Sequence, residues 1–252
     1  AIDLAPDVSV YHTLRAAVFS GYRQQDSGSR ERECAHLLES VPYDSCLARK
    51  VYLISREAAE QRPLDWRPRL NLAESALTLA LIERDADLVS EAIGLYTEVA
   101  QLDPQSTSHL ERLAAVHLQV GQPEAALEPL EKSLAILDGI SRSAVSWLLE
   151  GMSYLQMGEP ATALGAFSES IRLNPNLSDA YTNRGSAYNA LGRYQRAIQD
   201  LDEAIKLNHK VPMAFNNRGT SYANLDQLQR AIEDFDEAIR LDQRFALAYS
   251  NR

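Results

Sequence analysis

The stretch DAYTNRGSAYNALG at residues 179–192 decides the fold, because the chain repeats it with few changes 34 residues later. Residues 213–226 read MAFNNRGTSYANLD, so an aromatic residue, the Asn-Arg-Gly triplet and the next Tyr all return at the same step. The motif begins a further time in ALAYSNR, at residues 246–252. A period of this length indicates a stack of equal structural units in place of one globular core.

Other positions keep the same step of 34 residues. They are the Gly-x-x-Tyr glycines Gly151, Gly185 and Gly219, the opening aromatics Trp147, Tyr181, Phe215 and Tyr249, the small residues Ala163, Ala197 and Ala231, and the large residues Phe167, Leu201 and Phe235. Each unit contains two amphipathic stretches separated by a short break such as NALGRY, which predicts two helices per unit. The small residues allow the two helices to approach closely, and the aromatics fill the space between units.

This spacing, with its small, aromatic and helix-ending positions, resembles the tetratricopeptide repeat family. The resemblance implies an all-α fold, a right-handed superhelical array of antiparallel helix pairs (a solenoid) whose first helices line a concave face. It predicts full repeats at 107–143, 144–177, 178–211 and 212–245, a degenerate repeat at 67–106, and an irregular, repeat-derived helical segment at 9–66. Residues 1–8 then form the tail of a truncated repeat and 246–252 the first helix of another, so we expect a window on a longer array, with self-association possible through its truncated ends.

Composition narrows the function classes. The 252 residues are 45% hydrophobic and 24% charged, with a formal net charge of −10. Without a basic stripe, this charge argues against a nucleic-acid partner. No apolar run approaches the roughly 20 residues that cross a bilayer. The five His residues are scattered, and we find no zinc spacing, catalytic triad or phosphate-binding glycine loop. The sequence therefore predicts a protein that is not an enzyme and uses no metal or cofactor.

A ladder of Asn residues is the candidate binding feature. Asn183, Asn217 and Asn251 repeat at 34 residues on first helices, and in similar arrays such Asn side chains grip the backbone of a peptide, since an amide both donates and accepts. The alternative is that Asn recurs only because the repeats were duplicated. The candidate groove also includes Thr182, Ser186, Asn216, Thr220 and Ser250, whereas Leu149 and Arg112 replace the Asn upstream.

The family resemblance also bears on the kind of peptide. Some family members hold a C-terminal carboxylate with cations on the same face. Asp179, Met213 and Leu247 occupy the positions where those cations are expected here. Binding of a chaperone tail is therefore not expected.

A second ladder is formed by Arg184, Arg218 and Arg252, with Asp200 and Asp234 at matching places in second helices. Arg and Asp vary together, because Glu150 accompanies Ala166 and Leu113 accompanies Pro129. We therefore predict charge-assisted hydrogen bonds from Arg184 to Asp200 and from Arg218 to Asp234, with a structural role. Arg252 is expected to lack an acidic partner.

The two cysteines, Cys34 and Cys46, lie in a stretch that reads as helix, turn, helix. At similar heights in such a hairpin they could form a disulfide, or remain as two free buried thiols. The strings YHTLRAAVFSGYR, RERECAHLLESVPYDSCLARKVYL and QRPLDWRPRLNLAESAL resemble the repeat tails of bacterial O-antigen polymerase or ligase-like membrane proteins. That resemblance implies an extracytoplasmic location, which permits the disulfide; otherwise a cytoplasmic location is expected.

Three functions follow from these patterns. The first is a protein–protein interaction scaffold that binds an extended peptide or a partner helix in its concave groove. The second is an extracytoplasmic accessory domain of a membrane O-antigen polymerase or ligase-like protein. The third is a substrate-recruiting arm of a glycosyltransferase. In all three the partner is a protein or peptide, without nucleic acid and without insertion of this segment into a membrane.

Overall fold

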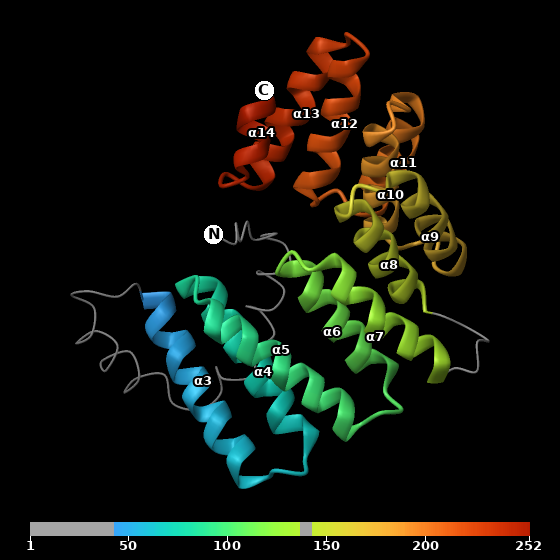
Figure 1. The fold of residues 1–252 in the computed structure, drawn as a ribbon. Helices are drawn as coiled ribbons and strands as arrows, with labels where there is room; N and C mark the ends of the chain where they lie inside the picture. Colours follow the sequence, from blue (N-terminus) through green and yellow to red (C-terminus); the bar gives the residue numbers. More distant parts are fainter. Residues whose placement is uncertain (1–42, 137–142) are drawn as a thin grey trace. The chain divides into compact units, whose positions relative to one another are not determined.

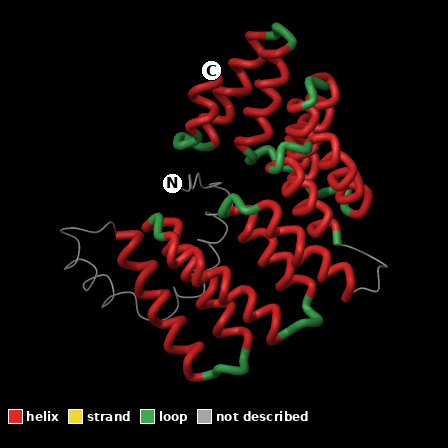
Figure 2. Tube along the Cα trace, in the orientation of Figure 1, coloured by secondary structure: helices red, strands yellow, loops and turns green. Residues whose placement is uncertain are grey.

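In a computed structural model of the protein, the structure describes residues 43–136 and 143–252. Within these ranges the chain forms twelve helices and no strand (Figures 1 and 2). The all-α prediction is confirmed for this part of the chain. None of its helices is long and apolar enough to cross a membrane. The chain divides into two compact units after Gln122, and each unit is described by itself.

The first unit contains α3 (Tyr43–Gln61), α4 (Trp66–Glu83), α5 (Ala86–Leu102) and α6 (Thr107–Gln119), each packed on the next. Its core is rich in alanine, because Ala73, Ala76, Ala80 and Ala92 are fully buried and let neighbouring helices approach closely. Asp65 and Asp85 cap the N-termini of α4 and α5 through their side chains. The remainder of the predicted segment 9–66, with Cys34 and the side chain of Cys46, lies outside the described residues, so the disulfide stays a prediction.

The second unit is a row of helical hairpins that follows α7 (Pro123–Ile136). Its helices are α8 (Ala144–Gln156), α9 (Pro160–Leu173), α10 (Ser178–Ala190), α11 (Tyr194–Leu207), α12 (Pro212–Asn224), α13 (Leu228–Leu241) and α14 (Ala246–Asn251). The closest packing joins α8 to α9, α10 to α11 and α12 to α13. These three pairs lie within the predicted repeats 144–177, 178–211 and 212–245.

Each hairpin of the second unit is closed by a glycine against a large side chain of the second helix. A Cβ atom on Gly151 would stand 2.5 Å from the ring of Phe167, one on Gly185 would stand 2.7 Å from Leu201, and one on Gly219 would stand 2.7 Å from the ring of Phe235. Only a residue without a Cβ allows this approach. The fully buried ring of Phe167 fills the space that the glycine leaves.

The turn inside each hairpin uses a residue with positive φ. Gly158 and Gly192 have φ of 78° and 68°, and Asp226 takes the same place in the third hairpin with φ of 57°. The turn lets the next backbone N–H close the helix end, as when Arg193 donates to the carbonyl of Tyr188 at 2.8 Å. Asp is one of the few residues with a Cβ that tolerates this left-handed region, which explains how the hairpin survives without a glycine.

Candidate functional site

The first helices of the hairpins lie side by side in the second unit, with α8 against α10, α10 against α12 and α12 against α14. On each helix, side chains four and seven residues apart share one side. We use the name first-helix face for the surface made by one such stripe from each helix. Its members are Val145, Leu149 and Met152 on α8; Asp179, Asn183 and Ser186 on α10; Met213, Asn217, Thr220 and Asn224 on α12; and Leu247 and Asn251 on α14.

Hydrogen bonds join neighbouring first helices at this face. The side-chain amide of Asn217 donates to the Oγ of Ser186 at 2.9 Å and thereby links α12 to α10. The amide of Asn251 donates to the Oδ1 of Asn216 at 3.0 Å and links α14 to α12. With the contact from Asn216 to Asn217, these bonds link Ser186, Asn217, Asn216 and Asn251 across three repeats.

The three residues of the Asn ladder have different environments, although the sequence treats them as equivalent. Asn183 is half-buried; its Nδ2 donates to the carbonyl of Asp179 at 2.9 Å, and its Oδ1 has no hydrogen-bond partner among the described residues. Asn217 is buried, and its Oδ1 accepts from Asn216 at 3.4 Å. Asn251 is exposed. The oxygen of Asn183 thus remains available for a partner, whereas the amide of Asn217 is occupied within the protein.

A buried polar seam continues from Asn217 between α10 and α12. The Nδ2 of Asn189 donates to the backbone carbonyl of Asn217 at 2.8 Å, and the Oγ of Ser221 donates to the Oδ1 of Asn189 at 2.6 Å. Ser221 is fully buried, as is Asn216 nearby. Since an unpaired polar group in such a place is costly, the seam fixes the register of one repeat on the next.

The hydroxyls in the predicted groove bond mainly to their own helices. Thr182 donates to the carbonyl of Ser178 and is buried, whereas the half-buried Thr220 donates to the carbonyl of Asn216. Ser250 donates to the carbonyl of Leu247 on the exposed side of α14. Thr220 therefore keeps an accessible oxygen on the first-helix face, whereas Thr182 does not contribute to it.

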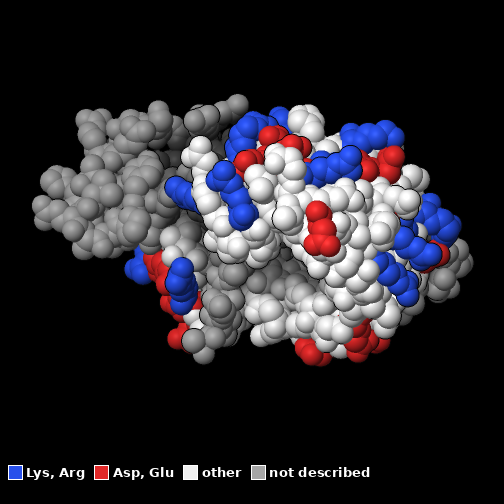
Figure 3. Space-filling model, turned by 90° about the horizontal axis from the view of Figure 1, so that it is seen from above, with Lys and Arg blue, Asp and Glu red and all other residues white. Residues whose placement is uncertain are grey.

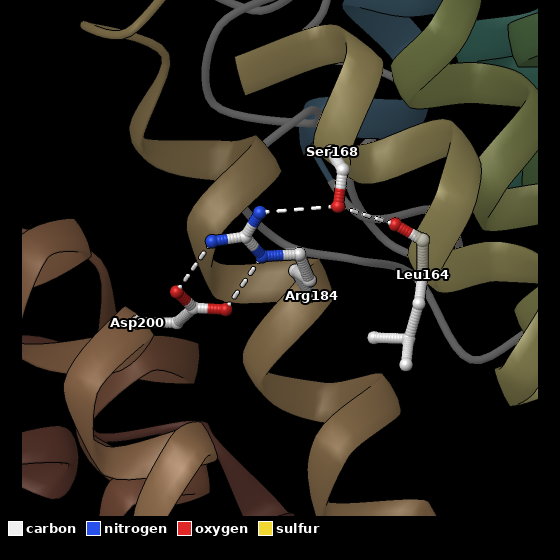
Figure 4. Close-up of polar contacts among 4 residues, drawn as sticks. All are labelled: Leu164, Ser168, Arg184 and Asp200. Atoms are coloured by element: carbon white, nitrogen blue, oxygen red, sulfur yellow. Dashed lines mark hydrogen bonds and ion pairs between the residues drawn. The ribbon is translucent and has the colours of Figure 1, made fainter. Parts of the chain in front are cut away.

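The Arg residues of the second ladder lie on another side of the same helices and bind Asp carboxylates. We call these Arg–carboxylate contacts the clasp. Arg184 donates from Nε and Nη2 to the two carboxylate oxygens of Asp200, both at 2.8 Å, as Figure 4 shows. Arg218 binds Asp234 in the same way, at 2.8 and 2.7 Å. Both bidentate pairs are those predicted from the sequence, and each joins the two helices of one hairpin.

Each Arg also reaches back to the preceding repeat, a contact that the sequence reading missed. The Nη1 of Arg184 donates to the Oγ of Ser168 at 3.2 Å (Figure 4), and the Nη1 of Arg218 donates to Asp202 at 2.7 Å. Ser168, Asp202 and Asp236 follow one another at 34 residues. This regular spacing could have identified these positions in the sequence as partners of the Arg residues in the following repeat.

The expectation that Arg252 lacks an acidic partner is wrong. Its Nε lies 2.7 Å from Asp236, the residue that corresponds to Asp202 one repeat earlier. Only the acid of the same hairpin was considered in the sequence, whereas the contact that forms crosses between hairpins. All three Arg residues of the ladder are thus paired with carboxylates.

These contacts stabilise the charged guanidinium groups. The pKa of Arg184 and that of Arg218 are raised, first by the hydrogen bonds to Asp200 and Asp234 and partly opposed by burial. The carboxylates of Asp200 and Asp234 are themselves buried. A cation held this way has a structural role and does not offer its charge to a ligand.

Replacing Ser168 with Asp should strengthen the clasp. The new carboxylate would face Arg184 in the same way that Asp202 faces Arg218 one repeat later. We expect a gain of about 0.5–1 kcal/mol in unfolding free energy, the range of a partly exposed ion pair. Urea unfolding followed by circular dichroism measures it. Asp202→Ser, the reverse change one repeat later, serves as the matched control and should destabilise by a similar amount. A Ser168→Asp variant that is less stable than the parent contradicts this view of the clasp.

Upstream, the ladder positions are filled differently. Leu149 is buried in the second unit. In the first unit, Arg112 forms an ion pair with Glu74 on α4. Tyr96 lies close to this pair, and burial, followed by the charge of Glu74, raises its pKa well above the ordinary value. At these two upstream positions a buried apolar residue and a paired cation therefore take the place of the Asn.

Charge is mixed over the surface. In the view of Figure 3, blue and red side chains lie next to one another around broad uncharged areas and do not gather into one patch of either sign. Within residues 43–136 and 143–252, no cluster of His, Cys, Asp or Glu suits a metal ion.

Comparison with known proteins agrees with this architecture. Residues 178–211 and 212–245 each match the family model described as tetratricopeptide repeat. These two segments are tetratricopeptide repeats. No curated protein sequence matches it significantly.

Solved structures show the same fold at low sequence identity. TTC0263, a TPR protein from Thermus thermophilus, is 20% identical with a TM-score of 0.58, over 71% of this chain and 96% of that one. YrrB is 20% identical with a TM-score of 0.50, over 78% and 96%. A chain of the APC/C hetero-tetramer Cut9–Hcn1 is 18% identical with a TM-score of 0.59, over 82% and 46%.

Proposed function

We propose that this protein is an interaction scaffold that holds an extended segment of a partner protein against the first-helix face. The observation that carries the proposal is the continuity of that face, in which hydrogen bonds from Asn217 to Ser186 and from Asn251 to Asn216 join three helices into one surface. A rigid row of first helices presents fixed hydrogen-bonding groups along a line, which suits an extended chain.

The side chains available for such a partner are Asn183, Thr220, Asn224 and Asn251. Asn224 is exposed, and its Nδ2 donates to the carbonyl of Thr220 at 2.9 Å, which leaves its Oδ1 as an acceptor, as in Asn183. Amide oxygens of this kind accept from the N–H groups of a bound backbone whatever its side chains are. Asn224 was not among the residues singled out in the sequence, although it follows Asn217 by seven residues on one helix side.

Two further considerations support a binding role without catalysis. Catalysis requires side chains gathered in a site that excludes water, whereas the first-helix face is an open row of amides, hydroxyls and apolar groups. The similar protein YrrB is described as having an unusual peptide-binding site. A role in binding peptides is therefore compatible with the fold, although the residues used must come from this chain.

The test uses a phage-displayed library of random twelve-residue peptides, with selected peptides measured by fluorescence anisotropy. Asn183→Ala should weaken binding about fivefold to tenfold, the effect of losing one hydrogen bond to a backbone group. Asn176→Ala, an exposed Asn in the loop after α9, is the matched control and should leave affinity unchanged. If no peptide is enriched, or if Asn183→Ala and Thr220→Val bind every selected peptide as the parent does, the proposed function is wrong.

A further inference from the structure

The first-helix face is almost without charge. Asp179 is its only ionisable residue. Arg184 on α10, Arg218 on α12 and Arg252, directly after α14, are each paired with an Asp carboxylate. No cation of these helices is left to receive an acidic side chain or a terminal carboxylate, and a partner with either would lose hydration without compensation.

Apolar side chains recur at the two ends of the face. Val145 and Leu247 occupy corresponding positions of repeats three units apart and are 44% and 47% exposed. Met152 on α8 and Met213 on α12 are half-buried beside them. Between these ends, α10 contributes the polar residues Asn183 and Ser186. At the row of corresponding positions 145, 179, 213 and 247, the face is therefore apolar at Val145, acidic at Asp179, and apolar again at Met213 and Leu247. The other positions of the face on α12 and α14 are polar.

The spacing of these helices sets a length. Packed helices lie about 8–10 Å apart, so the stripes of α8 and α12 are separated by roughly 16–20 Å. An extended chain advances about 3.3 Å per residue, which makes this five or six residues. Side chains of an extended chain alternate between its two sides, so that only an even separation points both toward the same surface.

We infer that the partner segment is an internal stretch without acidic side chains that carries two apolar side chains six residues apart, one against Val145 on α8 and the other against Met213 at the corresponding position of α12. Asn183 accepts from the backbone between them. The inference rests on the proposed function and adds the chemistry and register of the ligand. It assigns to Val145 and Met213 the recognition of side chains, and to Asn183 the recognition of backbone.

The experiment uses amidated, acetylated peptides with one Ser/Thr/Gly framework. One peptide carries Leu at positions i and i+6, one at i and i+5, and one ends in a free carboxylate preceded by two Glu residues. We expect the i+6 peptide to bind at least tenfold more tightly than either of the others. Val145→Asp and Met213→Asp should each weaken it about tenfold, whereas Ile232→Asp, which changes an exposed (38%) residue on the second helix α13, should not.

The outcomes separate this inference from the proposed function. If the acidic peptide or the i+5 peptide binds best and Asn183→Ala weakens it, the face binds peptides but the assigned chemistry is wrong. If library selection yields only acidic sequences that still depend on Asn183, the inference is likewise overturned. If neither these peptides nor any selected peptide responds to changes on the face, the proposed function fails together with the inference. Circular dichroism of each variant confirms that the helices are retained.

Discussion

Replacing Arg218 with Ala is expected to lower the unfolding free energy by about 3–5 kcal/mol, because Asp234 would keep its charge in a buried place without a partner. Arg218 also joins its repeat to the preceding one through Asp202. We therefore expect the amides of α12 and α13 to lose hydrogen-exchange protection. The contact of this hairpin with the preceding one should weaken as well. Urea unfolding gives the total change, and hydrogen exchange locates it.

Two controls define this result. Arg218→Ala combined with Asp234→Ala should recover part of the loss, since no buried charge then lacks a partner. Arg240→Ala removes an ion pair with Glu237 on the exposed side of α13 and should have a much smaller effect. If Arg218→Ala and Arg240→Ala prove equally mild, the clasp does not stabilise the array.

Replacing Gly151 with Ala is expected to destabilise the protein by about 1–3 kcal/mol, even though Ala is the better helix former. The added Cβ would lie 2.5 Å from the ring of Phe167, which is fully buried and has no space to move. Thermal unfolding measured by circular dichroism tests this, and the loss should appear as a lower midpoint.

Gly165 provides a matched control in the second helix of the same hairpin. Nothing lies within 4 Å of a Cβ at that exposed position, so Gly165→Ala should stabilise by roughly 0.5–1 kcal/mol through helix propensity alone. Opposite signs for the same substitution in one hairpin are the specific expectation. A Gly151→Ala variant as stable as Gly165→Ala would show that the two helices can separate without cost.

Much of the fold can be predicted from sequence because its determinants lie close together along the chain. Gly185 meets Leu201 and Arg184 meets Asp200 across a single turn, sixteen residues apart. When a hairpin is duplicated, two residues that contact each other keep the same sequence separation in every copy. Pairs that recur together every 34 residues can therefore be recognised in the sequence. Arg and Asp occur together in some repeats and are both replaced in others, and this pattern was enough to predict the two Arg–Asp pairs.

Contacts between repeats are harder to predict, because they depend on how one hairpin lies on the next. Arg252 was expected to have no acidic partner and instead binds Asp236 of the preceding repeat. Asn217 belongs to the same repeating series as Asn183, yet packing of α12 against α10 buries it and turns its amide toward Ser186. Asn residues at equivalent positions of different repeats thus have different roles.

The sequence by itself determined the class of fold, the pairing of helices and the Arg–Asp pairs within hairpins, since these follow from local helix packing that each repeat encodes in full. The tertiary structure alone decided which amides remain open, which Arg residues bridge repeats, and which apolar side chains of the first-helix face are exposed. The physical reason is burial: whether a polar group faces water or a neighbouring helix depends on the register between repeats, and no single repeat contains that information.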